Sequence, residues 1–202
     1  MPNWCNNDIH LFHEDKEMIN RAEAALKEDK FFSEFLPCPK ELSNTVSGCV
    51  EEGYARELHE FQKELNLRYF GHKDWYDWTV NNWGTKWEVC EACVTRVSEN
   101  ALTASYDTAW SPPIAFYEKL QELGFIVKAF YYEPGMAFCG SWDDGDDCFY
   151  DIDGNSDWVE ENIPSEIDQA FCISQGMAEW EEENQEIDLD NGLSATNEQE
   201  KA

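Results

Sequence analysis

Positive charge is nearly absent from the second half of this sequence. Residues 129–200 contain no lysine, arginine or histidine, although they hold 21 of the 43 aspartates and glutamates of the 202-residue chain. The formal net charge of the whole chain is −29. Repulsion on this scale disfavours direct binding to DNA, RNA or an anionic membrane, and it favours a basic partner or neutralising cations.

The sequence also lacks segments typical of export or membrane insertion. No apolar run reaches the length of about 18 residues that a membrane-spanning helix needs. The start, Met1 to Trp4, has neither a basic nor an apolar region, so we expect no signal peptide. The eight cysteines are spread along a chain with enough apolar residues to fold without disulfides. These features predict a cytoplasmic protein with reduced thiols.

No recognised catalytic motif is present. The four histidines, His10, His13, His59 and His72, lack a surrounding Ser/His/Asp, Cys/His or glycine-rich phosphate-binding pattern. Carboxylate pairs are inevitable among 43 acidic residues, so they identify no hydrolase. The sequence favours a non-enzymatic function without a cofactor, and it leaves the question of an enzyme open.

The hydrophobic pattern predicts an α+β fold. Predicted strands cover residues 3–12, 92–97, 101–109, 125–132, 136–142 and 148–152. Predicted helices cover residues 14–30, 54–69, the segment after Ser111-Pro112-Pro113, and a last helix from Ile163 to about Glu183, while residues 31–53 are expected to be mostly loop. The order contains a β-α-β-β-α-β skeleton, which predicts a ferredoxin-like antiparallel sheet with a helical insertion after the first helix and a C-terminal hairpin plus helix.

Three parts of the chain follow from this order. Residues 1–152 are expected to form the ferredoxin-like domain, with the insertion at about residues 31–91. Residues 153–186 are expected to form an acidic helical extension. Residues 187–202 lack an apolar period and are expected to be a disordered acidic tail.

A tryptophan-rich loop is the first candidate binding site. Its candidate residues are Asn82, Trp83, Thr85, Lys86 and Trp87. Such a loop stacks a base or clamps a peptide through aromatic and cation–π contacts. The structural interpretation, which we favour, is that the two indoles cap the sheet edge, that Gly84 permits a tight turn and that Trp110 lies in the core.

Two patterns raise the question of a metal. Cys90 and Cys93 have zinc-ligand spacing, and a second half-site would have to come from Cys139 and Cys148 or from His72 and His10. However, odd spacing at the start of a strand is expected to direct the two thiols to opposite faces. The run Asp151-Ile152-Asp153-Gly154 with Glu160 matches part of an EF-hand loop, but Phe149 would occupy its first ligand position. A loose Ca²⁺ or Mg²⁺ site among residues 143–153 stays open, with a solvated acidic loop as the default.

Several motifs resemble those of one family. They are Met-Pro-Asn-Trp-Cys-Asn-Asn at residues 1–7, Asn-Trp-Gly-Thr-Lys-Trp at 82–87, Thr-Ala-Trp-Ser-Pro-Pro at 108–113 and Tyr-Glu-Pro-Gly-Met-Ala-Phe-Cys-Gly at 132–140. Together they are similar to the Api92-like proteins, also called the YubB ferredoxin-like group. The resemblance covers about residues 1–145. It implies a ferredoxin-like domain with an insertion, carried by bacteriophages and conjugative plasmids, and it implies no catalytic residues.

The acidic second half supplies the leading functional hypothesis. The candidate surface residues are Asp143, Asp144, Asp146, Asp147, Asp151, Asp153, Asp157, Glu160 and Glu161. Carboxylates on a rigid scaffold imitate the charge spacing of a nucleic-acid backbone, so they suit a basic cleft and associate with it quickly. We therefore expect an accessory protein that binds a basic protein of the bacterial host, as a nucleic-acid mimic or anti-defence inhibitor. A solubilising surface, a metal-binding protein or metal-dependent enzyme, and a nucleotide or nucleic-acid binder remain the alternatives.

Overall fold

The computed structural model describes residues 3–50 and 53–184. The chain divides into two compact units, Met1–Phe149 and Tyr150–Ala202, whereas the sequence pattern places the domain boundary at residue 152. The expected disordered tail at residues 187–202 lies outside the described residues.

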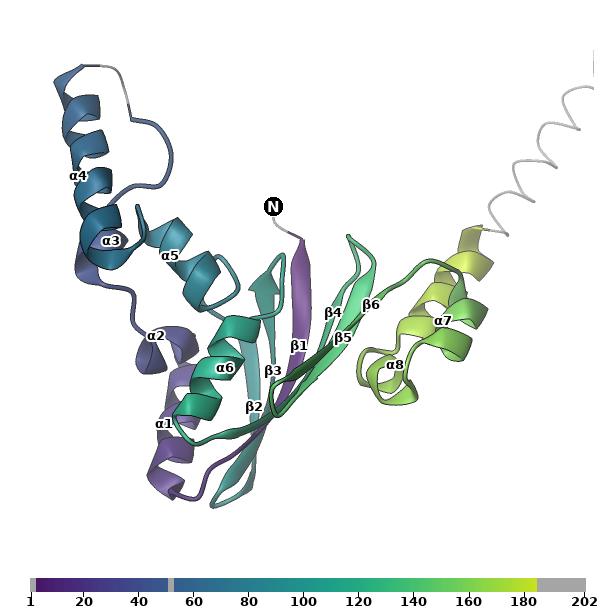
Figure 1. The fold of residues 1–202 in the computed structure, drawn as a ribbon. Helices are drawn as coiled ribbons and strands as arrows, with labels where there is room; N and C mark the ends of the chain where they lie inside the picture. Colours follow the sequence, from purple (N-terminus) through teal and green to yellow (C-terminus); the bar gives the residue numbers. More distant parts are fainter. Residues whose placement is uncertain (1–2, 51–52, 185–202) are drawn as a thin grey trace, which may run out of the picture. The chain divides into compact units, whose positions relative to one another are not determined.

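Six strands and eight helices have defined bounds in the described ranges (Figure 1). The strands are β1 (Trp4–Phe12), β2 (Cys90–Ser98), β3 (Ala101–Ala109), β4 (Ile126–Glu133), β5 (Phe138–Asp143) and β6 (Asp146–Asp151). The helices are α1 (Lys16–Lys27), α2 (Phe31–Phe35), α3 (Lys40–Ser43), α4 (Tyr54–Phe70), α5 (Trp75–Asn82), α6 (Ile114–Glu122), α7 (Ser156–Asn162) and α8 (Ser165–Phe171). No helix of the described residues has both the length and the apolar character needed to cross a membrane.

The strands form one antiparallel sheet in the order β2-β3-β1-β4-β5-β6. The first strand lies in the middle, where Ile9 pairs with Ala104 of β3 on one side and with Ala129 of β4 on the other. Asp144 and Gly145 form the turn between β5 and β6, with φ angles of 47° and 100°. Left-handed angles at both central residues are typical of a tight hairpin turn. The antiparallel sheet and the helices together make the fold α+β, as the sequence predicts.

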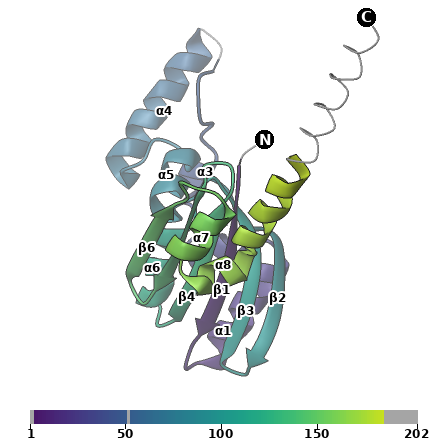
Figure 2. The same cartoon turned by 90° about the vertical axis from the view of Figure 1, so that its right-hand side faces the viewer.

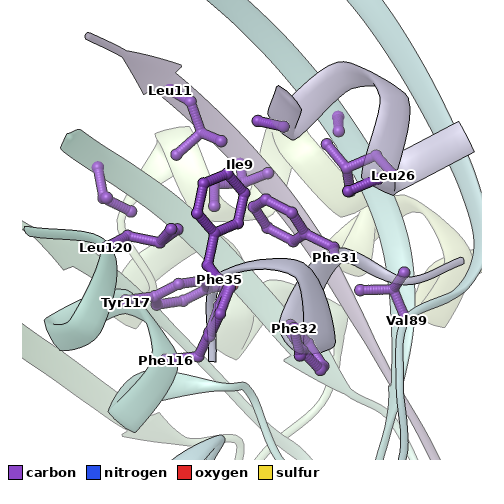
Figure 3. Close-up of a cluster of buried hydrophobic side chains, with 14 of the residues drawn as sticks. Ile9, Leu11, Leu26, Phe31, Phe32, Phe35, Val89, Phe116, Tyr117 and Leu120 are labelled. Carbon is purple, nitrogen blue, oxygen red and sulfur yellow. The ribbon is translucent and has the colours of Figure 1, made fainter. Parts of the chain in front are cut away.

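One face of the sheet carries the core. Along β1 the residues alternate, and Ile9 and Leu11 lie on the buried face. Helices α1 and α6 lie on this face in both views (Figures 1 and 2). Their apolar side chains meet those of α2 in a single cluster, in which Phe31, Phe32 and Phe116 contact one another (Figure 3).

The segment expected to be mostly loop is non-helical over most of its described residues, but it also contains two short helices that the sequence pattern did not predict. Phe31, Phe32 and Phe35 of α2 are buried, and this packing stabilises a helix that has no side-chain cap of its own at Lys30. The cap comes from a distant residue, because the carboxylate of Glu88 accepts hydrogen bonds from the backbone N–H groups of Phe32 and Ser33, at 3.0 and 2.6 Å. Tertiary contacts therefore decide the local structure in this segment.

The C-terminal unit contains more than the single helix that the sequence predicts. Helices α7 and α8 precede a further helical stretch, residues 173–184. Cys172 separates that stretch from α8 with a left-handed φ of 51°. Asp168 then accepts hydrogen bonds of 2.7 Å from both the backbone N–H and the hydroxyl of Ser174, which caps the new helix. The expectation of one continuous helix was wrong because this break leaves no mark in the hydrophobic period.

Candidate functional site

An aromatic pocket opens beside α5 in the first unit. Its volume is about 320 Å³. The residues that line it are Cys38, Ser43, Trp75, Thr79, Trp83, Lys86, Trp87 and Glu88. We refer to this set as the aromatic pocket. Three of its residues belong to the tryptophan-rich loop identified from the sequence.

The loop is held in place by the segment that follows β3. Gly84 adopts a φ of +85°, and a Cβ atom there would lie 3.0 Å from the backbone nitrogen of Ile114. The hydroxyl of Ser111 donates a 2.6 Å hydrogen bond to the Gly84 carbonyl. The hydroxyl of Thr85 donates one of 2.9 Å to the carbonyl of Ala109. Residues 82–87 thus bind to residues 108–113, and these contacts fix the position of the loop.

Three of the five candidate loop residues have structural roles. Trp83 is only 6 % exposed, its ring packs against Phe32, and its Nε1 donates a 2.9 Å hydrogen bond to the carbonyl of Leu36. It therefore belongs to the core, and the expectation that it caps the sheet edge was wrong. Thr85 is buried, and the side-chain amide of Asn82 donates to the carbonyl of Trp78 at 2.8 Å.

Of the remaining two loop residues, Trp87 is exposed and Lys86 is half-buried. The Lys86 Nζ lies 4.6 Å from the ring centre of Trp87, 5.4 Å from that of Trp110 and 5.5 Å from that of Tyr76. Trp110 is 47 % exposed, so it is not the core residue that the sequence pattern predicts. Among the described residues no ion pair involves Lys86. The aromatic faces hold this ammonium group without neutralising it.

The pocket also contains a carboxyl group and a thiol. Burial raises the pKa of Glu88 above its ordinary value, although its hydrogen bonds to the α2 backbone act in the opposite direction. Burial likewise raises the pKa of the Cys38 thiol to about 11. Cys38 is therefore a neutral thiol near pH 7 and lacks the thiolate character of a nucleophile.

This geometry suits binding rather than covalent chemistry. Cavities of about 300 Å³ or more with apolar walls and a few fixed polar groups are typical of small-molecule sites. In this pocket tryptophan rings supply the walls and Lys86 supplies one positive charge. Trp75, Thr79 and Glu88 also line it, although they were not among the candidates chosen from the sequence. The density of aromatic residues at 75–87 was the available signal.

The acidic candidates are distributed over both units. Asp143, Asp144, Asp146 and Asp147 are exposed in and around the β5–β6 turn of the first unit. Asp144 accepts a hydrogen bond of 2.9 Å from the side-chain amide of Gln121, and Asp147 accepts one of 2.7 Å from the hydroxyl of Tyr131. This hairpin cluster is therefore partly engaged within its own unit.

The remaining acidic candidates belong to the C-terminal unit. They are Asp151, Asp153, Asp157, Glu160 and Glu161, and all are exposed. Two other carboxylates of this unit have structural roles: Asp168 caps residues 173–184, and Glu181 accepts hydrogen bonds of 2.9 and 2.8 Å from the N–H and hydroxyl of Ser156 at the start of α7. Residues 150–184 contain no basic residue, so no lysine, arginine or histidine of this range neutralises the exposed carboxylates.

The cysteine pair has an arrangement that sequence spacing does not reveal. Cys90 pairs with Asp107, and Cys93 pairs with Ser105, which is only two residues away on β3. Between these two pairs β2 has one residue more than β3, and a β-bulge with Glu91 at a φ of 54° accommodates it. Cys90 and Cys93 therefore occupy the same face, which corrects the expectation of opposite faces. In the described ranges, no group of three or more His, Cys, Asp or Glu side chains is arranged to hold a metal ion, and this applies equally to the EF-hand-like run.

No family model matches the chain. No curated protein matches it either. A crystal structure of the protein Api92 from Yersinia pseudotuberculosis is similar over 77 % of this chain and 99 % of that chain, with 11 % sequence identity and a TM-score of 0.42. This is a distant structural similarity.

Proposed function

We propose that this protein is a non-enzymatic binding protein that captures a basic protein through the exposed carboxylates of its C-terminal unit. One observation carries the proposal: residues 150–184 present exposed acidic side chains and contain no Lys, Arg or His. A basic partner relieves the repulsion among these groups, so association is favourable, fast and sensitive to salt.

The arrangement of the carboxylates supports this proposal. On α7, Asp157, Glu160 and Glu161 follow a spacing of three and four residues, which places them on one side of the helix. Glu179, Glu182 and Glu183 are exposed on residues 173–184. Helices hold their charges at fixed positions, which a flexible acidic segment does not.

The proposal also includes the fold family and the biological setting. The order β2-β3-β1-β4, built from a β-α-β-β-α-β chain, supports a ferredoxin-like core with β5 and β6 added at one edge. The sequence motifs favour a phage or plasmid origin. In that setting the partner is a basic protein of the bacterial host cytoplasm, such as a nucleic-acid-binding defence protein that the acidic unit inhibits by mimicry.

A capture experiment with charge-matched variants tests the proposal. The first variant replaces Asp157, Glu160, Glu161 and Glu182 with the corresponding amides. The control variant replaces four exposed glutamates of the first unit, Glu14, Glu41, Glu99 and Glu118, with glutamine. Both variants have the same net charge. We expect a host protein that binds the wild type and the control at low salt and is released at high salt.

The position of the charges, rather than their number, decides the outcome. Loss of the partner in the first variant alone supports the proposal. Equal retention by both variants, or the absence of any salt-sensitive basic partner, refutes it.

A second candidate function rests on the aromatic pocket. The ammonium group of Lys86, held by aromatic faces and free of ion pairs in the described part of the chain, favours a planar ring that carries a negative group. A mononucleotide has this chemistry and adds little to the repulsion that opposes long nucleic acids. Calorimetric titration with adenosine monophosphate and with adenosine tests this candidate, since only the charged ligand gains from Lys86.

A further inference from the structure

Helix α4 exposes its apolar side. Tyr54, Leu58, Phe61 and Tyr69 are 75, 50, 57 and 72 % exposed. Together with the partly exposed Leu65 they follow a spacing of four, three, four and four residues, so they form one stripe along the 17-residue helix. We refer to these five residues as the α4 stripe. In a helix that packs on its own core, such a stripe faces inward.

The polar side of α4 is the side bound to the rest of the chain. Lys63 Nζ donates a 2.8 Å hydrogen bond to the carbonyl of Gly48. Asn66, the buried residue of the helix, donates hydrogen bonds of 2.9 Å to the hydroxyl of Thr45 and to the carbonyl of Lys73. The neighbouring segment thus occupies the side opposite the stripe, and Figure 1 shows α4 apart from the sheet.

An acidic row lies along one edge of the stripe. Glu57, Glu60 and Glu64 are exposed and are separated by three and four residues, so they lie on the same side of the helix. Lys63 pairs with Glu60 at the long distance of 4.0 Å. The surface of α4 therefore offers apolar contacts on the stripe and negative charges beside it.

We propose that the α4 stripe is a docking site for an amphipathic helix of a partner protein, with lysines or arginines beside its own apolar face. An amphipathic helix recognises a complementary apolar surface through anchors at three- and four-residue intervals. Its basic residues lie next to Glu57, Glu60 and Glu64, where they gain from charge complementarity.

Charge also argues against a second copy of this chain as the occupant. Two copies bring together two molecules of net charge −29. An antiparallel pair of α4 helices would also set the acidic rows Glu57–Glu64 against each other. A basic helix experiences neither of these two repulsions. This inference rests on α4 and does not depend on the C-terminal carboxylates.

A model peptide tests the inference with the full chain. The probe is a synthetic lysine–leucine amphipathic helix of about 18 residues, and the reference is a peptide of the same composition in an order that removes the apolar face. Fluorescence anisotropy of labelled peptide gives both affinities. We expect the amphipathic probe to bind at least about tenfold more tightly than the reference, since both peptides carry the same charge.

Two variants locate the site. Leu58→Ser with Phe61→Ser removes the centre of the stripe, and Leu67→Ser alters an exposed leucine (48 % exposed) of the same helix that is not part of the stripe. We expect the double variant to lose the preference for the amphipathic probe and the Leu67 variant to retain it. Circular dichroism verifies that both variants keep the helix content of the wild type.

Four results overturn the inference. Equal binding of both peptides to the wild type, or an unchanged preference in the double variant, removes the docking site. Light scattering that shows a dimer in the wild type and a monomer in the double variant assigns the stripe to a second copy. A probe affinity that rises when Ile187 and Leu189 are changed to serine assigns it to the chain's own terminal segment. Each result is independent of the charge variants of residues 157–182.

Discussion

The ammonium nitrogen of Lys86 lies 4.6 Å from the centre of the Trp87 ring. This pair lines a pocket together with Trp83, which belongs to the core. A charge held in this way on a fixed loop needs no rearrangement to meet an anionic ligand, which reduces the cost of binding.

We predict that Lys86→Met weakens binding of adenosine monophosphate by about tenfold and leaves adenosine binding unchanged. Methionine keeps the apolar stem but removes the charge, and one cation–π or charge contact contributes on the order of 1–2 kcal/mol. Calorimetric titration measures both affinities. Lys119→Met, on α6 and outside the residues that line the pocket, serves as the control. An equal loss for both ligands would contradict a charge-specific role.

We predict that Gly84→Ala destabilises the first unit more than Gly145→Ala does. Both glycines have left-handed φ angles, +85° and +100°, and the strain of such an angle costs alanine about 1–2 kcal/mol. Only at Gly84 does the new Cβ meet fixed backbone, at 3.0 Å from Ile114 and 3.2 Å from the Pro112 carbonyl oxygen. The difference between the variants, about 1–3 kcal/mol, measures the close packing of the two motifs. Chemical denaturation gives both values, and equal losses would exclude this role for Gly84.

We predict that Asn7→Ala costs about 2–4 kcal/mol of unfolding free energy, whereas Asn6→Ala costs less than about 1 kcal/mol. The two residues are neighbours on opposite faces of β1. Asn7 is 1 % exposed and donates to the Cys5 carbonyl at 2.8 Å and to the Thr108 hydroxyl at 2.9 Å, while it accepts from the Tyr117 hydroxyl at 3.4 Å. Its loss removes these hydrogen bonds from a buried site, although the Thr108 hydroxyl keeps its bond to the Ser111 carbonyl and the Tyr117 hydroxyl keeps its bond to Tyr106. Similar losses in both variants would mean that this buried network contributes little.

We predict that Glu88 makes the protein less stable as the pH rises. Burial raises the pKa of Glu88 in the folded protein above its ordinary value of 4.5, so the folded state retains a proton that the unfolded state releases. The contribution of Glu88 to stability therefore falls as the pH increases from about 4.5 through the raised pKa. Glu88→Gln removes this dependence. Unfolding midpoints at several pH values between about 4 and 7 compare the two proteins. Parallel curves, or a wild type that gains stability relative to the variant with rising pH, would contradict the assignment.

Patterns within short stretches of the sequence predicted β1 and α1, because neighbouring residues determine these elements. The bulky residues Ile9, Leu11 and Phe12 identified β1, and the helical spacing of Ile19, Ala22 and Leu26 identified α1. The cap of α2, by contrast, comes from Glu88, 56 residues after Phe32 in the chain, so no window around Phe31 reveals it.

In the candidate sites, too, the sequence predicted some features and missed others. The tryptophan-rich loop was visible in the sequence, but the roles within it were not. Trp83 is buried and Trp87 is exposed because contacts between the loop and the segment after β3 fix the position of the loop. The apolar spacing of Leu58 and Phe61 predicted α4, yet which side of the helix meets the protein depends on hydrogen bonds to Gly48 and Thr45. The sequence periodicity predicts that these apolar residues form a stripe, but it does not predict that the stripe is exposed.

The salt dependence of one association tests the central claim most directly. With the basic partner captured from host lysate, the dissociation constant is measured at about 0.05 and about 0.5 M salt for the wild type, for the C-terminal variant at Asp157, Glu160, Glu161 and Glu182, and for the charge-matched control. We predict a weakening on the order of tenfold or more for the wild type and the control, and a weak, nearly salt-independent interaction for the C-terminal variant. Identical salt curves for all three proteins would contradict the proposal that the C-terminal carboxylates form the binding surface.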